Sequence, residues 1–120
     1  MNNFQFKRSD RVSQEIKDII STLLLSNKVI LSDSGLITIT KVKTSDNLRF
    51  SRIYLSFIGN TKSAEELIGS INKNLNEYRY NLGKSLQIKY VPQIKFYHDD
   101  SFEQIEHIAT IINKTKNASK

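Results

Sequence analysis

The sequence predicts a single α+β domain in which helices pack on one face of a three-stranded mixed sheet. A length of 120 residues is enough for one hydrophobic core but not for two. Apolar residues recur at helical spacing in some segments and alternate with polar residues in others. Pro92, the only proline, separates a helical segment from the last predicted strand. Together these observations indicate a small fold of alternating helices and strands.

Composition and charge narrow the classes of function. The formal net charge is +6 and the pI is about 9.6, which favours an acidic partner, with nucleic acid ahead of anionic lipid. The absence of cysteine excludes disulfides and thiolate metal sites. Because no long apolar run and no signal-peptide stretch occur, we expect a cytoplasmic protein that does not span a membrane.

The charge is concentrated in the middle of the sequence. Residues 41–95 contain ten Lys and Arg against four Asp and Glu, whereas residues 99–106 contain four acidic residues and no basic one. Polarised charge favours docking in one orientation, although the solvated faces of an ordinary basic protein would give the same pattern.

The first predicted elements are a helix and a β-hairpin. Ser9 or Asp10 can cap a helix that continues to about Ser26, and its polar face mixes both charges, which favours core packing over membrane binding. After a loop at 32–35, alternating apolar residues predict strands over 36–43 and 50–58, joined by a turn at 44–47. One face of the second strand carries Ile53, Leu55 and Phe57, and the other carries Arg52, Tyr54 and Ser56.

A longer helical pattern follows the hairpin. Residues 63–66 form a capping box, and the apolar periodicity continues without a phase slip, so periodicity alone predicts one helix to about residue 87. Asn72, Asn74 and Asn76 are poor helix formers, however, and we expect a break near Asn74. In the second half of this element, Arg79 and Lys84 are expected to point outward. A strand over 93–97 and a terminal helix over 101–112 complete the chain.

The order of elements is that of a type II KH domain (helix, strand, strand, helix, kink, helix, strand) with an added C-terminal helix. Six motifs that occur in order make the chain similar to the ribosome-binding factor A family, and the resemblance covers the chain from about Arg8 to Ile112. The motifs are Arg8-Ser9-Asp10-Arg11-Val12, Thr38-Ile39-Thr40-x-Val42, Ser45-x-x-Leu48, Ser51-Arg52-Ile53-Tyr54-Leu55-Ser56-x-x-Gly59, Arg79-x-x-Leu82-Gly83-Lys84 and Pro92-x-Ile94-x-Phe96-x-x-Asp99-x-Ser101.

The resemblance implies a non-enzymatic assembly factor. Such a protein binds the immature small (30S) ribosomal subunit and supports maturation of its rRNA, especially in the cold, as a cytoplasmic monomer without a cofactor. The KH-like RNA-binding domain would span residues 8–113, between a flexible N-terminus (1–7) and a flexible basic tail (114–120). Two alternatives stay open: a general KH module for single-stranded RNA, and a protein–protein adaptor that uses the bare sheet face.

The candidate RNA-binding site centres on the expected break. The family's Ala-x-Gly kink falls on Asn74-Leu75-Asn76, and asparagine tolerates non-helical backbone. A break exposes N–H groups and the positive end of the second helix to phosphate, while amide and tyrosine side chains can contact bases. The predicted RNA-binding residues are Arg8, Arg11, Lys73, Asn74, Leu75, Asn76, Arg79, Tyr80, Lys84 and Lys89. The plainer interpretation is that these polar residues only cover a solvated face.

No catalytic site or metal is expected. The sequence has no Gly-rich phosphate loop, nucleophile elbow or paired acid–base set. His98, Asp99, Glu103 and His107 could be grouped as metal ligands. Asp99 is more simply interpreted as an acidic residue in front of the N-terminus of the predicted terminal helix.

Overall fold

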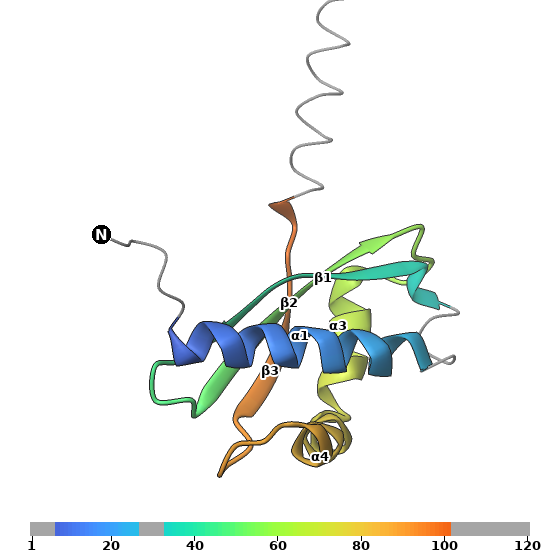
Figure 1. Ribbon diagram of the computed structural model, residues 1–120. Helices are drawn as coiled ribbons and strands as arrows, with labels where there is room; N and C mark the ends of the chain where they lie inside the picture. The colour runs from blue at the N-terminus through green and yellow to red at the C-terminus, as the bar shows by residue number, and fades with distance from the viewer. Residues whose placement is uncertain (1–6, 27–32, 102–120) are drawn as a thin grey trace, which may run out of the picture.

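A computed structural model describes residues 7–26 and 33–101 of the chain (Figure 1). The elements are α1 (Arg8–Ser26), β1 (Leu36–Thr44), β2 (Phe50–Ile58), α3 (Ala64–Asn72), α4 (Leu75–Ser85) and β3 (Gln93–His98). This order confirms the prediction as far as the last strand. The predicted terminal helix, beyond its first residue, and the basic tail lie outside the described residues. Within the described part, no helix has the length and apolar character needed to cross a membrane.

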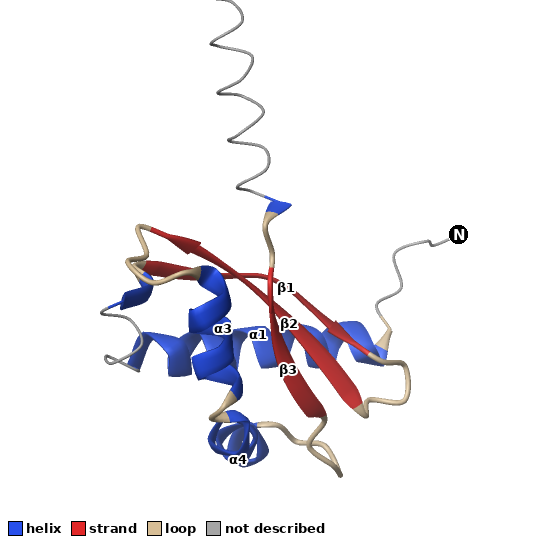
Figure 2. Ribbon diagram, turned by 180° about the vertical axis from the view of Figure 1, so that it is seen from behind, coloured by secondary structure: helices blue, strands red, loops and turns tan. Residues whose placement is uncertain are grey.

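The three strands form one mixed sheet in the order β1-β2-β3. β1 and β2 pair antiparallel as a hairpin, whereas β2 and β3 pair parallel (Figure 2). The parallel pair requires a crossover connection, and α3 and α4 supply it. The chain therefore has the α-β-β-α-break-α-β order of a type II KH-like domain.

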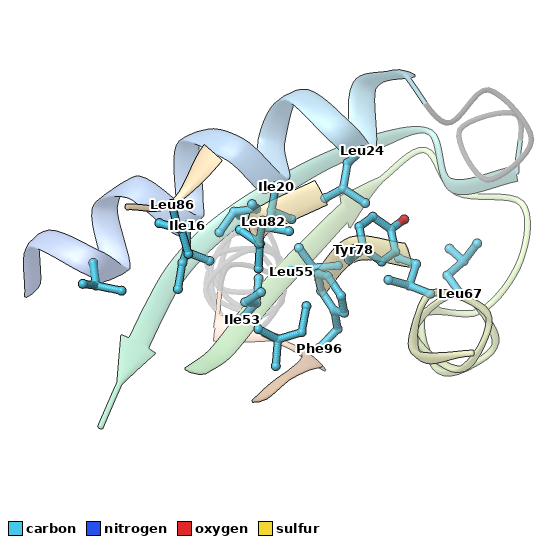
Figure 3. Packing of buried hydrophobic residues seen from close by; sticks show 14 of the residues in the cluster. Ile16, Ile20, Leu24, Ile53, Leu55, Leu67, Tyr78, Leu82, Leu86 and Phe96 are labelled. Atoms are coloured by element: carbon cyan, nitrogen blue, oxygen red, sulfur yellow. The ribbon is translucent and has the colours of Figure 1, made fainter. Parts of the chain in front are cut away.

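The core lies between the helices and one face of the sheet (Figure 3). Ile53 and Leu55 of β2 are fully buried there, as is Ile20 of α1. Tyr78 of α4 meets Phe96 of β3 edge to face, with ring centroids 5.3 Å apart. The predicted core face of β2 is thus confirmed. Since the core residues of all the described helices belong to this one cluster, no described helix covers the opposite face of the sheet.

A β-bulge in β1 adjusts the register of the hairpin. The pairing shifts between Ile39 and Lys41, so Thr40 is the extra residue. As a result, Ile39 and Val42 both face the core although they are three positions apart, opposite Leu55 and Ile53 respectively. The bulge also places Lys41 on the opposite face.

Two side chains fix the ends of α3. Ser63 is its N-cap and accepts a hydrogen bond from the Glu66 N–H at 3.2 Å, as the capping box predicted. At the other end, the Asn72 amide donates to the Phe96 carbonyl at 3.1 Å and accepts from the Phe96 N–H at 2.9 Å. These bonds hold the end of α3 beside β3 and thereby position the break that follows.

Candidate nucleic-acid interface

The helical segment is broken at Lys73 and Asn74. α3 ends at Asn72 and α4 begins at Leu75, and Asn74 leaves the helical region with φ −109° and ψ 25°. In Figure 2, α4 is viewed along its axis while α3 is seen from the side, so the chain changes direction sharply. The break expected near Asn74 is confirmed, and the continuous helix that periodicity alone predicts is wrong. The periodicity persisted because both helices pack on the same core.

The N-terminus of α4 is open to a ligand. The Asn74 side chain makes no capping hydrogen bond. The backbone carbonyl of Asn74 accepts hydrogen bonds from the N–H groups of Glu77 and Tyr78 at 3.1 and 3.3 Å. The backbone N–H groups of Leu75 and Asn76, the first two residues of α4, have no acceptor within the helix. With the helix dipole, these donors favour a phosphate at this position.

Exposed side chains extend this site along α4. Asn76, Tyr80 and Lys84 follow one another at steps of four residues, so they share one face of the helix. Tyr80 is 66% exposed, and the Lys84 Nζ lies 4.5 Å from the centre of its ring. Together with the two residues of the break, they form what we call the kink patch: Lys73, Asn74, Asn76, Tyr80 and Lys84. It combines phosphate counter-ions with an exposed aromatic ring.

Two predicted site residues have structural roles instead. Leu75 is half-buried and packs against the core, so only its backbone is available to a ligand. Arg79 was expected to point outward, and this is wrong. Its Nε donates to the Pro92 carbonyl and its Nη2 to the Val91 carbonyl, both at 3.1 Å. The guanidinium thus holds the α4–β3 loop, because two carbonyls with no strand partner lie within its reach.

A second basic site brings together residues that are distant in sequence. Arg8 and Lys89, two of the predicted residues, line a hollow of about 200 Å³. Tyr90 is 58% exposed, and the Arg49 guanidinium and the Lys89 Nζ lie 5.3 Å and 5.5 Å from the centre of its ring. We call this site the Tyr90 hollow, and its lining is Arg8, Asn47, Leu48, Arg49, Ile88, Lys89 and Tyr90.

The sequence interpretation missed Arg49 and Tyr90 of this hollow. Both belong to connecting segments, and the signal that could have found them is an aromatic residue next to Lys89 in a basic loop. An adjoining hollow of about 330 Å³ extends from Arg49 and Tyr90 to Arg79. Arg11 is exposed on α1 but lines neither hollow.

Asp99 takes part in a hydrogen-bonded cluster. It accepts hydrogen bonds from the Thr40 hydroxyl at 2.5 Å and from the Ser101 N–H at 3.0 Å. Hydrogen bonds from the Ser101 side chain, Thr40 and the Ser101 backbone, with a smaller contribution from Lys41, lower the pKa of Asp99 to about 2. Asp99 therefore joins β1 to the segment after β3. Of the other members of the hypothetical metal site, His98 lies in β3, whereas Glu103 and His107 lie outside the described residues.

The order of elements, the mixed sheet and the break between α3 and α4 define a type II KH-like domain. Comparison with known proteins gives the family. The family model of ribosome-binding factor A matches residues 8–112. The chain is 33% identical over 110 residues to the ribosome-binding factor A of Geobacter sp. (strain M21), covering 90% of each chain. It is 32% identical over 111 residues to that of Geotalea daltonii, covering 91% of this chain and 88% of the relative. The chain belongs to the ribosome-binding factor A family.

Solved structures of this family share the fold. The crystal structure of ribosome-binding factor A from Thermus thermophilus matches with a TM-score of 0.64 at 11% identity, over 75% of this chain and 94% of that one. A homology model of the Thermus thermophilus protein, as fitted into the cryo-EM map of a 30S complex, matches with a TM-score of 0.55 at 12% identity. That match covers 78% of this chain and 92% of the fitted one. At these identities the similarity establishes the fold alone.

Proposed function

We propose that this protein binds the immature small ribosomal subunit in the cytoplasm and assists maturation of its rRNA, without catalysing a reaction. Membership of the ribosome-binding factor A family is the observation that carries the proposal. The Thermus thermophilus relative fitted into a 30S complex supports the choice of subunit. The net charge of +6 suits an rRNA partner.

The kink patch is the proposed rRNA contact. The N–H groups at the start of α4, with Lys73 and Lys84, would bind phosphates, while Tyr80 would stack on an unpaired base. Binding energy would hold one rRNA conformation during assembly, and the factor would leave once the mature fold competes for the same segment. The need for such help increases in the cold, because misfolded RNA pairings then separate more slowly.

Sedimentation of cell extract tests the proposal. We expect the protein to migrate with free small subunits and not with mature ribosomes or mRNA. In a pelleting assay with purified small subunits, affinity should fall by orders of magnitude between about 50 and about 200 mM salt, because Lys and Arg release counterions from phosphates. Migration with mRNA would instead favour a general RNA-binding module. An affinity independent of salt would contradict the electrostatic basis of the proposal.

A double variant tests the break itself. Asn74→Ala with Asn76→Ala should favour a continuous helix, with a gain in helix stability of up to about 1 kcal/mol from intrinsic propensity. Subunit binding should weaken nonetheless, because the N–H groups at the start of α4 would be taken up by the helix. Thermal melting and subunit pelleting are measured together.

The matched control for this variant is Gln14→Ala with Thr22→Ala, which changes two polar residues of α1 away from the kink patch. The control should bind as the parent does. If the variant at the break also binds as the parent does, the break is not the rRNA contact, and the Tyr90 hollow becomes the better candidate.

A further inference from the structure

The face of the sheet opposite the helices is basic and aromatic. The three strands contain no Asp or Glu. Their outward positions carry what we call the open sheet face, which consists of Lys41, Lys43, Arg52, Tyr54, Lys95 and Tyr97. Lys41, Lys43, Arg52 and Lys95 are all exposed. The family's kink lies on the helical side of the domain, so the open sheet face is a separate surface.

The strand register aligns these side chains in two rows. Lys43 lies opposite Arg52, and Arg52 lies opposite Lys95, which gives a row of three cations across the whole sheet. Neighbouring strands are roughly 5 Å apart, and like charges directly opposite one another destabilise a sheet. An arrangement that costs stability is explained if an anionic ligand binds along the row.

The next row adds aromatic surface beside the cations. Tyr54 lies opposite both Lys41 and Tyr97. The rings of Tyr54 and Tyr97 are stacked, with centroids 5.5 Å apart and an interplanar angle of 28°. The Lys41 Nζ is 4.5 Å from the Tyr54 ring centre, and the Lys95 Nζ is 5.6 Å from that of Tyr97. A base can stack on such a pair while its phosphates contact the cations.

The described acidic residues leave this charge largely uncompensated. The two ion pairs among the described residues are Lys7–Asp46 and Lys62–Asp33, and neither includes a cation of the open sheet face. Asp99 bonds Thr40 of β1 and Ser101, and Lys41 makes the smallest of the contributions to the lowered pKa of Asp99. The row from Lys43 to Lys95 therefore keeps its positive potential for a partner.

We propose that the open sheet face is a second RNA-binding surface, which takes a single-stranded segment. The row of Lys43, Arg52 and Lys95 binds its phosphates, and the Tyr54–Tyr97 pair stacks on a base. Alternation of charge with flat aromatic surface fits RNA better than an acidic protein, which has no bases to stack. The identity of the RNA as small-subunit rRNA rests on the proposed function. The domain would then contact RNA on two sides of its sheet.

Binding of a fluorescein-labelled oligouridylate to the full chain, followed by anisotropy at several salt concentrations, tests the surface. Arg52→Ala with Lys95→Ala should weaken binding and reduce the slope of log affinity against log salt by about 1.4, since each phosphate contact on a single strand contributes about 0.7. Lys17→Ala with Lys62→Ala removes the same charge elsewhere and should leave the slope unchanged. Equal slopes for the two double variants overturn the proposal.

The tyrosine pair has its own test. Tyr97→Leu keeps much of the bulk of the side chain and should weaken oligouridylate binding roughly five-fold or more, with an unchanged salt slope, because stacking is lost and phosphate contacts remain. Photocrosslinking with 4-thiouridine RNA should join Tyr54 or Tyr97 to the RNA. Crosslinks confined to Tyr80 and Tyr90 overturn the proposal. On small subunits, crosslinks from this face to a ribosomal protein instead of rRNA overturn it as well.

These outcomes separate the inference from the proposed function. Suppose that the parent pellets with small subunits while Arg52→Ala with Lys95→Ala leaves the salt slope of oligouridylate binding unchanged. In that case only the open sheet face is excluded as an RNA-binding surface. If the parent fails to pellet while the oligouridylate results hold, the ribosomal function fails and the RNA surface stands. Thermal melting checks that each variant is folded, and Arg52→Gln with Lys95→Gln replaces any alanine pair that melts early.

Discussion

The two faces of the sheet are built from the same three strands but have opposite roles: one packs in the hydrophobic core, and the other presents charged side chains to solvent. In β2, Ile53 and Leu55 are fully buried under the helices, whereas Arg52, between Ser51 and Ile53, is exposed on the other side. Because successive residues of a strand point to opposite faces, a shift of one position moves a side chain from the core to the solvent. The comparison teaches that the buried core and the exposed charge occupy alternate residues of the same strand, so the core can change while the charge of the open face stays the same.

The largest expected effect comes from the covered face. Phe57→Ala or Ile94→Ala should lower the free energy of unfolding by about 2–5 kcal/mol, because each leaves a cavity in the core. That is a large share of a small domain's total stability. Arg52→Ala, on the open face, should change it by no more than about 0.5 kcal/mol. Urea unfolding of the variants gives the values, and an unchanged midpoint for Phe57→Ala would mean that the two faces are inverted.

A smaller effect distinguishes a structural cation from the exposed ones. Arg79→Ala should cost about 1–3 kcal/mol, because the loop loses two hydrogen bonds from a charged, half-buried group. Lys84→Ala and Arg52→Ala are the exposed counterparts and should be nearly neutral. Arg79→Lys should recover only part of the loss, since an ammonium cannot reproduce the two-pronged geometry. If Arg79→Ala melts with the parent, the guanidinium is only a surface group.

The smallest effect is a dependence on pH at the edge of the open face. The pKa of Asp99 is about 2 in the folded protein, below its usual value of 3.8. Asp99 therefore stabilises the fold fully at pH values above the pKa of the unfolded chain, and this contribution is lost as the pH falls through the pKa of the folded protein. Solvent screening keeps the contribution modest. Asp99→Asn should therefore flatten the acid side of a plot of melting temperature against pH between about 4 and 2. If the melting temperatures of variant and parent fall identically at acid pH, the hydrogen bonds of Asp99 do not stabilise the fold.

Much of the covered face could be predicted from the sequence because its causes are local. Alternation in β2, the capping box at Ser63 and the helix-averse residue Asn74 each act over a few positions, and each prediction is confirmed. The bulge at Thr40 was not predicted, since it depends on how β1 pairs with β2.

The parts of the candidate site that escaped prediction depend on contacts between distant residues. Arg79 is held by carbonyls of Val91 and Pro92, which nothing in its own helix specifies. The Tyr90 hollow joins the start of α1, the hairpin turn and the α4–β3 loop, so only the folded chain brings Arg8 and Arg49 together.

The hydrogen bonds of Asn72 also affect how copies of the protein meet. Within the described sheet β3 is an edge strand, and the unpaired N–H and C=O groups of such an edge are a template on which another strand can add. The Asn72 amide occupies both groups of Phe96, near the middle of that edge. A foreign strand would have to displace this amide before pairing. One side chain at the end of α3 thus hinders the addition of a second copy's strand at the β3 edge of the sheet.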